Sequence, residues 1–275
     1  PVTIIPVGSS GVIDPAAVRD ALGADVGIVS VMLANNEVGT VQPILEIADA
    51  TRTAGAWFHT DAVQAAGKVP IDLKAWAAVG VDLLTISAHK FTGPAGVGAL
   101  WIRRGVALTA TATGGRHERN RRAGTENVLG IIGMGAAATV ARESLAHVSD
   151  VAALRDHLEQ SLTERIPGLV VNGDIARRVA NTSNISVAGL EAESLLIALD
   201  LEGIAVSTGA ACSSGTLEPS HVLKAMGLPR ERTRNSLRFS LGHTTTRADI
   251  DRVVSVLPGL VDKLRRLTRS AAEVR

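Results

Sequence analysis

The chain has 275 residues, of which 46% are hydrophobic and 20% are charged, and this length is typical of about two domains with a substantial core. Its 28 basic and 27 acidic residues leave a net charge of +1, and only 2% of the residues are aromatic. This composition argues against a general electrostatic attraction to nucleic acid or anionic membranes, and against aromatic surfaces that stack on bases.

The single cysteine, Cys212, excludes a disulfide framework within the chain and favours a reducing compartment, most simply the cytoplasm. The longest nearly apolar run, at 128–141, spans 14 residues, whereas a helix that crosses a bilayer needs roughly 18. We therefore expect no membrane contact. The chain opens on Pro1, and Val2–Val7 is typical of a strand inside a domain, so we expect an N-terminal piece to be missing.

Short apolar runs alternate with amphipathic stretches in the first half of the chain. A helix is predicted over 43–54, with Pro43 in its first turn. Strands are predicted over 26–33, 56–59, 81–87 and 97–102. This alternation predicts an α/β domain with a mostly parallel sheet.

The pattern changes after residue 113. Glycines and four arginines at 114–127 predict a long loop, and a helix of small residues follows over about 128–146. Further helices are predicted over 151–165, 193–201 and 247–269, and strands over 184–187 and 235–241. We therefore expect a large domain at 1–147, with its N-terminal part missing, and a smaller α+β domain at 148–275.

Three consecutive predicted strands lead into polar residues that a buried core would not select. In open α/β sheets, ligands bind beyond the carboxyl ends of the strands. If the strands are parallel neighbours, these polar side chains converge at one edge of the sheet. They are Asn36, Asp61, Gln64, Ser87, His89 and Lys90.

This set of side chains suits pyridoxal 5′-phosphate. A lysine at a strand end can form a Schiff base, and a carboxylate such as Asp61 can keep a pyridinium nitrogen protonated. Ser87 and His89 can donate hydrogen bonds to a phosphate. Two alternatives stay open at this point, namely Lys90 as a solvated loop lysine and Asp61 as the N-cap of a helix.

Five long segments resemble the cysteine desulfurases, the NifS- and IscS-like branch of the fold-type I pyridoxal-phosphate enzymes in the class-V aminotransferase family. They are ANNEVGTVQPI (34–44), HTDAVQAAGK (59–68), SAHKFTGPAGVGALW (87–101), GGRHERNRRAGTEN (114–127) and STGAACSSGTLEPSHVL (207–223). The resemblance implies that fold and a homodimer that converts L-cysteine to L-alanine. It also implies sulfur transfer to an acceptor, such as an iron–sulfur scaffold protein, for cluster or thio-cofactor biosynthesis.

The resemblance assigns cofactor roles by position. Lys90 matches the Schiff-base lysine, which also moves protons at the substrate carbon, and Asp61 matches the partner of the pyridine nitrogen. The remaining positions match residues that contact the phenolic oxygen (Asn36 and Gln64), the phosphate (Ser87 and His89) and the phosphate of the neighbouring subunit (Thr125).

Two further residues are assigned to the substrate. Cys212 matches the nucleophile that accepts sulfur as a persulfide, whereas most free cysteines are inert and buried. Arg238 matches the residue that grips the substrate α-carboxylate, a task for which a guanidinium is well shaped, and Asn36 is assigned to the substrate as well. An exposed arginine on an edge strand is the alternative for Arg238.

Two other functions stay open. The family obtains a phosphate-binding threonine and a ring-stacking histidine from an N-terminal segment that has no counterpart here, so a truncated, non-catalytic homologue that acts as a binding module is one alternative. A related pyridoxal-phosphate aminotransferase or selenocysteine lyase is the other. The lone cysteine argues against that second alternative, because transamination needs no thiol.

Overall fold

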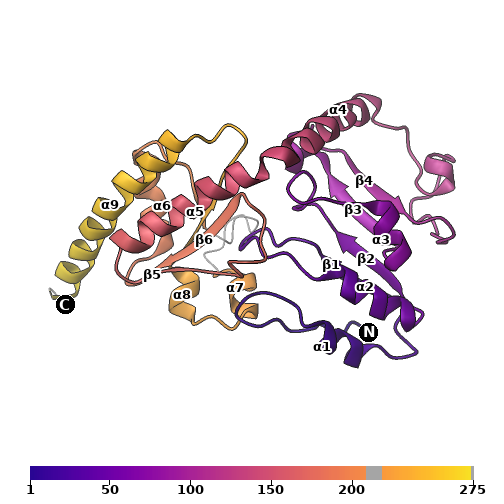
Figure 1. Ribbon diagram of the computed structural model, residues 1–275, viewed down its shortest axis with the longest axis horizontal. Coiled ribbons are helices and arrows are strands. Elements are labelled where there is room, and N and C mark those ends of the chain that lie inside the picture. The colour runs from indigo at the N-terminus through magenta and orange to yellow at the C-terminus, as the bar shows by residue number, and fades with distance from the viewer. Residues whose placement is uncertain (209–218, 274–275) are drawn as a thin grey trace. The chain divides into compact units, whose positions relative to one another are not determined.

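The computed structural model describes residues 1–208 and 219–273, which form two units (Figure 1). Unit 1 comprises Pro1–Asp14, Ala34–Gln42 and His147–Arg275, and unit 2 comprises Pro15–Leu33 and Pro43–Ala146. The predicted domain division between residues 147 and 148 stays a prediction. The grouping in space differs from it because two early segments belong with the C-terminal half of the chain.

Unit 2 is built on a four-stranded sheet in the order β1-β2-β3-β4. Its strands are β1 (Ile28–Met32), β2 (Trp57–Asp61), β3 (Leu83–Ser87) and β4 (Gly98–Ile102). The first three strands run parallel and β4 runs antiparallel to β3, so the predicted mostly parallel α/β sheet is confirmed. In the register, Met32 pairs with Asp61 and Asp61 pairs with Thr85, which aligns the carboxyl ends of the parallel strands.

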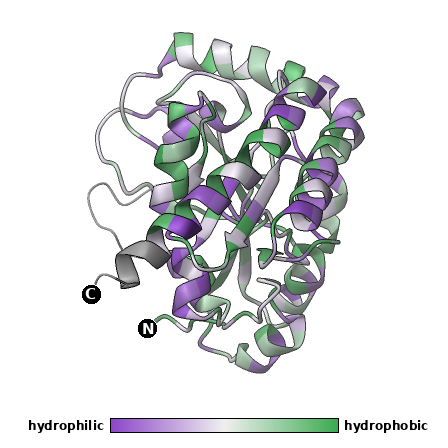
Figure 2. Ribbon diagram, turned by 90° about the vertical axis from the view of Figure 1, so that its left-hand side faces the viewer, coloured by the Kyte–Doolittle hydropathy of each residue, from purple (hydrophilic) through white to green (hydrophobic). Residues whose placement is uncertain are grey.

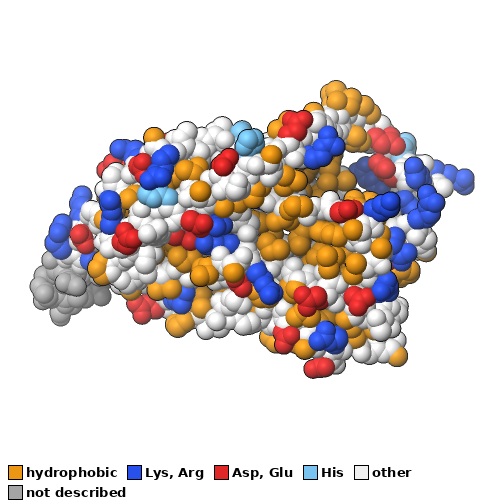
Figure 3. Space-filling view, viewed as in Figure 1, with side chains coloured by type: hydrophobic (Ala, Val, Ile, Leu, Met, Phe, Trp, Pro, Cys, Tyr) orange, Lys and Arg blue, Asp and Glu red, His pale blue; other side chains and the backbone are white. Residues whose placement is uncertain are grey.

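The two faces of this sheet have different surroundings. Helix α2 (Ile44–Thr53) contacts β2 and buries Ile44 and Ile47, next to α1 (Pro15–Ala21) and α3 (Leu73–Val79). Hydrophilic and hydrophobic residues alternate along the helices that face the viewer in Figure 2, as is typical of helices with one side on a core. On the other face Ile28, Trp57 and Leu100 are exposed, and hydrophobic side chains gather over these strands (Figure 3).

Helix α4 (Val128–Ser144), the 3-10 turn η3 (Leu145–His147) and α5 (Val148–Arg165) follow one another along the chain. Together they form a 38-residue helical stretch with an 18-residue window of mean hydropathy 1.3, of which 22% is buried. By length and composition alone this stretch could cross a membrane, so the shortness of the 14-residue run no longer excludes a span. The core helices of soluble proteins pass the same test.

Unit 1 contains a second four-stranded sheet, in the order β5-β6-β8-β7, with antiparallel pairs. Its strands are β5 (Leu169–Val171), β6 (Thr182–Val187), β7 (Ser207–Thr208) and β8 (Ser236–Ser240). Its helices are α5, α6 (Ala192–Leu201), α7 (His221–Ala225), α8 (Arg230–Arg234) and α9 (Arg247–Glu273). Leu158, Leu195 and Leu257 bring α5, α6 and α9 into one core with Leu237 of β8.

The predicted strand at residues 2–7 is wrong. These residues form no strand in the structure, and Val2 and Ile4 are 90% and 86% exposed. An apolar run becomes a strand only when it finds a partner that accepts its backbone hydrogen bonds.

Candidate active site

The carboxyl ends of β2 and β3 bring five of the predicted residues to one edge of the unit 2 sheet. Asp61 is the last residue of β2, with Gln64 three positions later, and Ser87 is the last residue of β3. His89 and Lys90 lie on the 3-10 turn η1 (Ala88–Phe91) directly after β3. The sixth predicted residue, Asn36, belongs to unit 1.

Lys90 is exposed, but the turn that carries it is anchored. Ala88 and Phe91 are buried and pack against Ala137 of α4. The backbone N–H of Gly93 donates to the Ala88 carbonyl at 2.8 Å, and a Cβ at Gly93 would lie 2.9 Å from the Ala88 Cβ. The turn therefore requires glycine there, and it holds the Lys90 backbone in one place while the amine reaches solvent.

Ser87 and His89 form a pair beside Lys90. The Ser87 hydroxyl and the His89 Nδ1 lie 2.8 Å apart, and one of the two donates to the other. A hydroxyl and an imidazole in contact can both turn a donor toward an anion, which is what a phosphate group requires.

Asp61 caps a turn. Its Oδ1 accepts from the backbone N–H of Val63 at 2.8 Å, and the residues that follow form turns without an α-helix, so the alternative of a helix N-cap is wrong. Gln64 Oε1 accepts from the Lys68 ammonium at 3.0 Å. The Asp61 carboxylate thus stands at the strand end with its orientation fixed by the backbone.

A polar row that we did not predict crosses the same face of the sheet. The Ser30 hydroxyl lies 2.8 Å from His59 Nδ1, and His59 Nε2 lies 3.3 Å from the Thr85 hydroxyl. Burial lowers the pKa of His59, and the Asp61 carboxylate opposes that shift. The signal was present in the sequence, because residues 59 and 61 on one strand share a face.

The arginine-rich loop lies before α4 in unit 2. It contains the 3-10 turn η2 (Glu118–Asn120), whose three residues all have positive φ, at 48°, 58° and 66°. Non-glycine residues with this backbone are strained, and such strain collects at functional positions. His117 Nδ1 lies 2.9 Å from a Glu126 carboxylate oxygen, and Thr125 between them is exposed. Basic side chains gather at this edge of the molecule (Figure 3).

Arg238 lies on β8, a central strand of the unit 1 sheet, paired with Asn184 of β6 and Ser207 of β7. It is half-buried, so the alternative of an exposed edge-strand arginine is wrong. Its Nη1 donates to the Asn36 carbonyl at 2.8 Å. Among the described residues, its Nε is buried and has no hydrogen-bond partner, which leaves a donor for a ligand. Cys212 lies outside the described residues.

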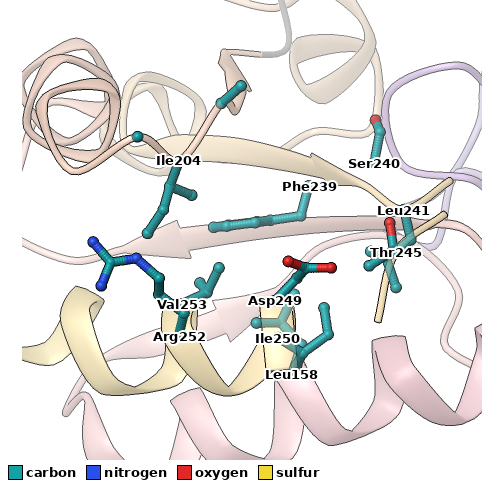
Figure 4. A pocket seen from close by; sticks show the side chains of 12 residues that line it. Leu158, Ile204, Phe239, Ser240, Leu241, Thr245, Asp249, Ile250, Arg252 and Val253 are labelled. Atoms are coloured by element: carbon teal, nitrogen blue, oxygen red, sulfur yellow. The ribbon is translucent and has the colours of Figure 1, made fainter. Parts of the chain in front are cut away.

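A cavity of about 230 Å³ lies on the opposite side of β8 (Figure 4). Phe239 lies in it among Ile204, Ile250 and Val253. Because side chains alternate along a strand, Phe239 points away from the face that carries Arg238. This cavity is therefore separate from the group around Arg238.

The donor set at the unit 2 sheet edge fits pyridoxal 5′-phosphate. It offers the solvent-reaching amine of Lys90, the oriented carboxylate of Asp61 and the Ser87–His89 pair. Within the two described ranges, 1–208 and 219–273, no three or more histidine, cysteine, aspartate or glutamate residues lie together so that they could hold a metal ion. Lys90, Asp61 and the Ser87–His89 pair suit an organic cofactor with an amine-reactive group and a phosphate.

The chain is similar to cysteine desulfurases in sequence and to a NifS-like protein in structure. A cysteine desulfurase of Cereibacter sphaeroides is 49% identical over 269 residues, which are 98% of this chain and 68% of that protein. A cysteine desulfurase of Nostoc sp. is 48% identical over 97% of this chain and 66% of that protein. A solved structure of a NifS-like protein has a TM-score of 0.87 at 33% identity, over 96% of this chain and 68% of that one.

The chain thus spans about two thirds of the length of these relatives. Residues 1–253 match the family model described as Aminotransferase class-V. With this match and these identities, the chain belongs to the class-V aminotransferase family, in its cysteine desulfurase branch.

Proposed function

We propose that this protein is a pyridoxal-phosphate-dependent cysteine desulfurase, which converts L-cysteine to L-alanine and carries the sulfur as a persulfide on Cys212. The single observation that carries this proposal is the sheet edge of unit 2. It presents Lys90, Asp61 and the Ser87–His89 pair together in a chain whose relatives bear that name.

Pyridoxal 5′-phosphate, once bound, supplies an electron sink that weakens bonds at the substrate α-carbon. Lys90 would hold its carbonyl carbon, Asp61 its pyridine nitrogen, and Ser87 and His89 its phosphate. The other proposed contacts follow the family positions: Asn36 and Gln64 for the phenolic oxygen, and Thr125 for the phosphate of the neighbouring subunit.

The chain's own residues supply the remaining chemistry. Arg238 binds the substrate carboxylate through charge-assisted hydrogen bonds, with Asn36 beside it. The Cys212 thiolate attacks the substrate sulfur, so one S–S bond forms and the C–S bond of the substrate breaks. Lys90 delivers a proton to the carbon that lost sulfur. Because one thiol and one cysteine give one persulfide and one alanine, the reaction balances without an oxidant.

An absorption spectrum tests the cofactor site. The purified chain should gain a visible absorption band on addition of pyridoxal 5′-phosphate, and Lys90→Ala should not, because the band requires the covalent link to that amine. Lys74→Ala is the matched control, an exposed lysine on α3 of the same unit, and it should keep the band. A wild-type spectrum without the band would support the non-catalytic homologue instead.

A product assay tests the role of Cys212. With an added thiol reductant that releases the persulfide sulfur as sulfide, Cys212→Ser should reduce alanine and sulfide formation from L-cysteine by more than about a hundredfold, because the variant lacks the nucleophile. Ser213→Ala is the neighbouring control and should retain activity. Unchanged turnover of an amino acid by Cys212→Ser would favour the related aminotransferase.

We also infer the setting of the reaction. The family positions, Thr125 above all, favour a homodimer, and the persulfide requires a sulfur acceptor, such as a scaffold for iron–sulfur cluster assembly. The single cysteine favours a reducing, cytoplasmic location.

A further inference from the structure

A short turn in unit 1 is fixed by its own first side chain. Asn35 Oδ1 accepts from the backbone N–H groups of Glu37 and Val38, at 2.8 and 3.0 Å. The Asn35 N–H donates to the Thr40 carbonyl at 2.9 Å and closes the turn. An asparagine that bonds its following backbone in this way holds the intervening carbonyl groups in set directions.

Two of those carbonyls face the sheet of unit 1. The Asn36 carbonyl accepts from Arg238 Nη1 at 2.8 Å, and the Glu37 carbonyl accepts from Asn184 Nδ2 at 3.2 Å. Arg238 and Asn184 are themselves paired across β8 and β6. The direction of the guanidinium therefore depends on the direction of the Asn36 peptide.

The side chain of Glu37 extends from the same turn to a third element. It is 2% exposed, and the Ser220 hydroxyl, 3% exposed, donates to its Oε2. Ser220 also accepts from the Leu223 N–H at 3.1 Å and so caps α7. Burial raises the pKa of Glu37, and Ser220, His221 and Arg238 all oppose that shift. Burying a carboxyl costs free energy of folding. Carboxyls whose pKa is shifted by burial and by a nearby charge are often found at functional sites.

We propose that Glu37 is a positioning residue: by binding Ser220 it fixes the turn whose Asn36 carbonyl orients the Arg238 guanidinium. That this orientation serves a substrate carboxylate rests on the proposed function. Ser220 lies eight residues after Cys212 in the sequence, so the same bond anchors the chain that leads away from the nucleophile. If Glu37 served only local packing within the turn, removal of the Ser220 hydroxyl would leave the turn unchanged.

Hydrogen exchange measured by mass spectrometry tests the link in the full chain with pyridoxal 5′-phosphate added. Glu37→Ala should speed exchange in the peptides at 34–42 and 219–226. Ser220→Ala should do the same at 34–42, although it lies outside that peptide. Glu37→Gln keeps an acceptor for Ser220 and should restore protection in both.

Asp82→Asn is the matched control, because Asp82 of unit 2 is a carboxyl of similar burial whose Oδ1 accepts from Arg103 Nε at 2.7 Å. It should leave both peptides unchanged. If Glu37→Ala does not fold, the Ser220→Ala result decides alone. Unchanged exchange at 34–42 in Ser220→Ala overturns the inference.

Steady-state kinetics test the consequence for the substrate. Glu37→Ala should raise the KM for L-cysteine about tenfold, with kcat changed much less, because one charge-assisted hydrogen bond to the carboxylate is misdirected. Glu37→Gln should recover most of the loss. A fall in kcat with unchanged KM would overturn the role assigned to Arg238 orientation. If the wild type forms no alanine, the proposed function fails, and the exchange results still decide the link.

Discussion

His59 makes the stability of unit 2 depend on pH. Burial lowers its pKa below the ordinary value of 6.5, although the Asp61 carboxylate opposes the shift. Below pH 6.5 the unfolded chain therefore binds a proton that the folded chain resists. The stabilising contribution of a neutral His59 is complete above that pH, and it is lost as the pH falls from there toward the folded-state pKa.

His59→Gln should remove this dependence. We expect the thermal unfolding midpoint of the wild type to fall more steeply than that of the variant between about pH 7.5 and about pH 5.5. Glutamine can still bond Ser30 or Thr85, so the comparison isolates the charge. His147→Gln, at an exposed histidine, is the control and should follow the wild type. Parallel curves for wild type and His59→Gln would contradict the role of burial.

For single residues, the sequence predicted that Asp61, Ser87 and Lys90 lie at strand ends, because each ends an apolar run that forms a strand or follows it within three residues. Their roles stay predictions. Glu37 could not be found in this way. It follows Asn36 in what looks like an ordinary polar loop, and its burial depends on Ser220, 183 residues later in the chain. Whether a carboxyl is buried is decided by tertiary contacts that no local pattern contains.

The elements of unit 2 were predictable where an apolar run was long enough to identify. All four of its strands lie within or beside predicted runs, since residues buried on a parallel sheet form continuous apolar stretches. The antiparallel direction of β4 follows from the short connection between Ser87 and Gly98, which has no room for a crossover helix. The two-residue strand β7 has no recognisable period and was missed.

Helix α3 begins at a single capping side chain. Asp72 Oδ1 accepts from the backbone N–H groups of Lys74 and Ala75, each at 3.0 Å. Asp72→Ala should destabilise the chain by about 1 kcal/mol, since two N–H groups lose their acceptor. The thermal midpoint should fall by about 2–4 °C.

Asp72→Asn keeps the acceptor and should lie close to the wild type in the same measurement. An equal loss in both variants would assign the effect to charge and contradict the cap. The carboxylate also interacts favourably with the helix dipole, so repeating both measurements at high salt separates that smaller contribution.

Large hydrophobic side chains are exposed on the unit 2 sheet and on α4. Ile28, Trp57 and Leu100 are exposed on one face of the unit 2 sheet, and α4 adds Leu129 and Ile132. Parallel sheets in α/β proteins are covered on both faces, and exposed apolar patches of this kind mark interfaces. This surface is consistent with the homodimer that we propose.

Leu129→Asp should therefore weaken self-association. Leu129 is 84% exposed, and a buried aspartate at an interface loses its hydration without a partner. Sedimentation velocity should show a shift from dimer toward monomer, with a dissociation constant raised at least about tenfold. Leu201→Asp on α6 of unit 1, at a residue 83% exposed, is the matched control. Equal sedimentation of both variants would exclude α4 from the interface.

The division of unit 1 into three stretches of chain has a consequence for its synthesis on the ribosome. Every residue of unit 2 has been synthesised once the ribosome reaches position 146. The hydrogen bond between the Asn36 carbonyl and Arg238 can form only after Arg238 is synthesised, 202 residues after Asn36. At 5–20 residues per second, this delay is about 10–40 s. A nascent chain can thus build the unit 2 sheet and the turn with Lys90 long before Arg238, the residue that we propose for the substrate carboxylate, has been synthesised.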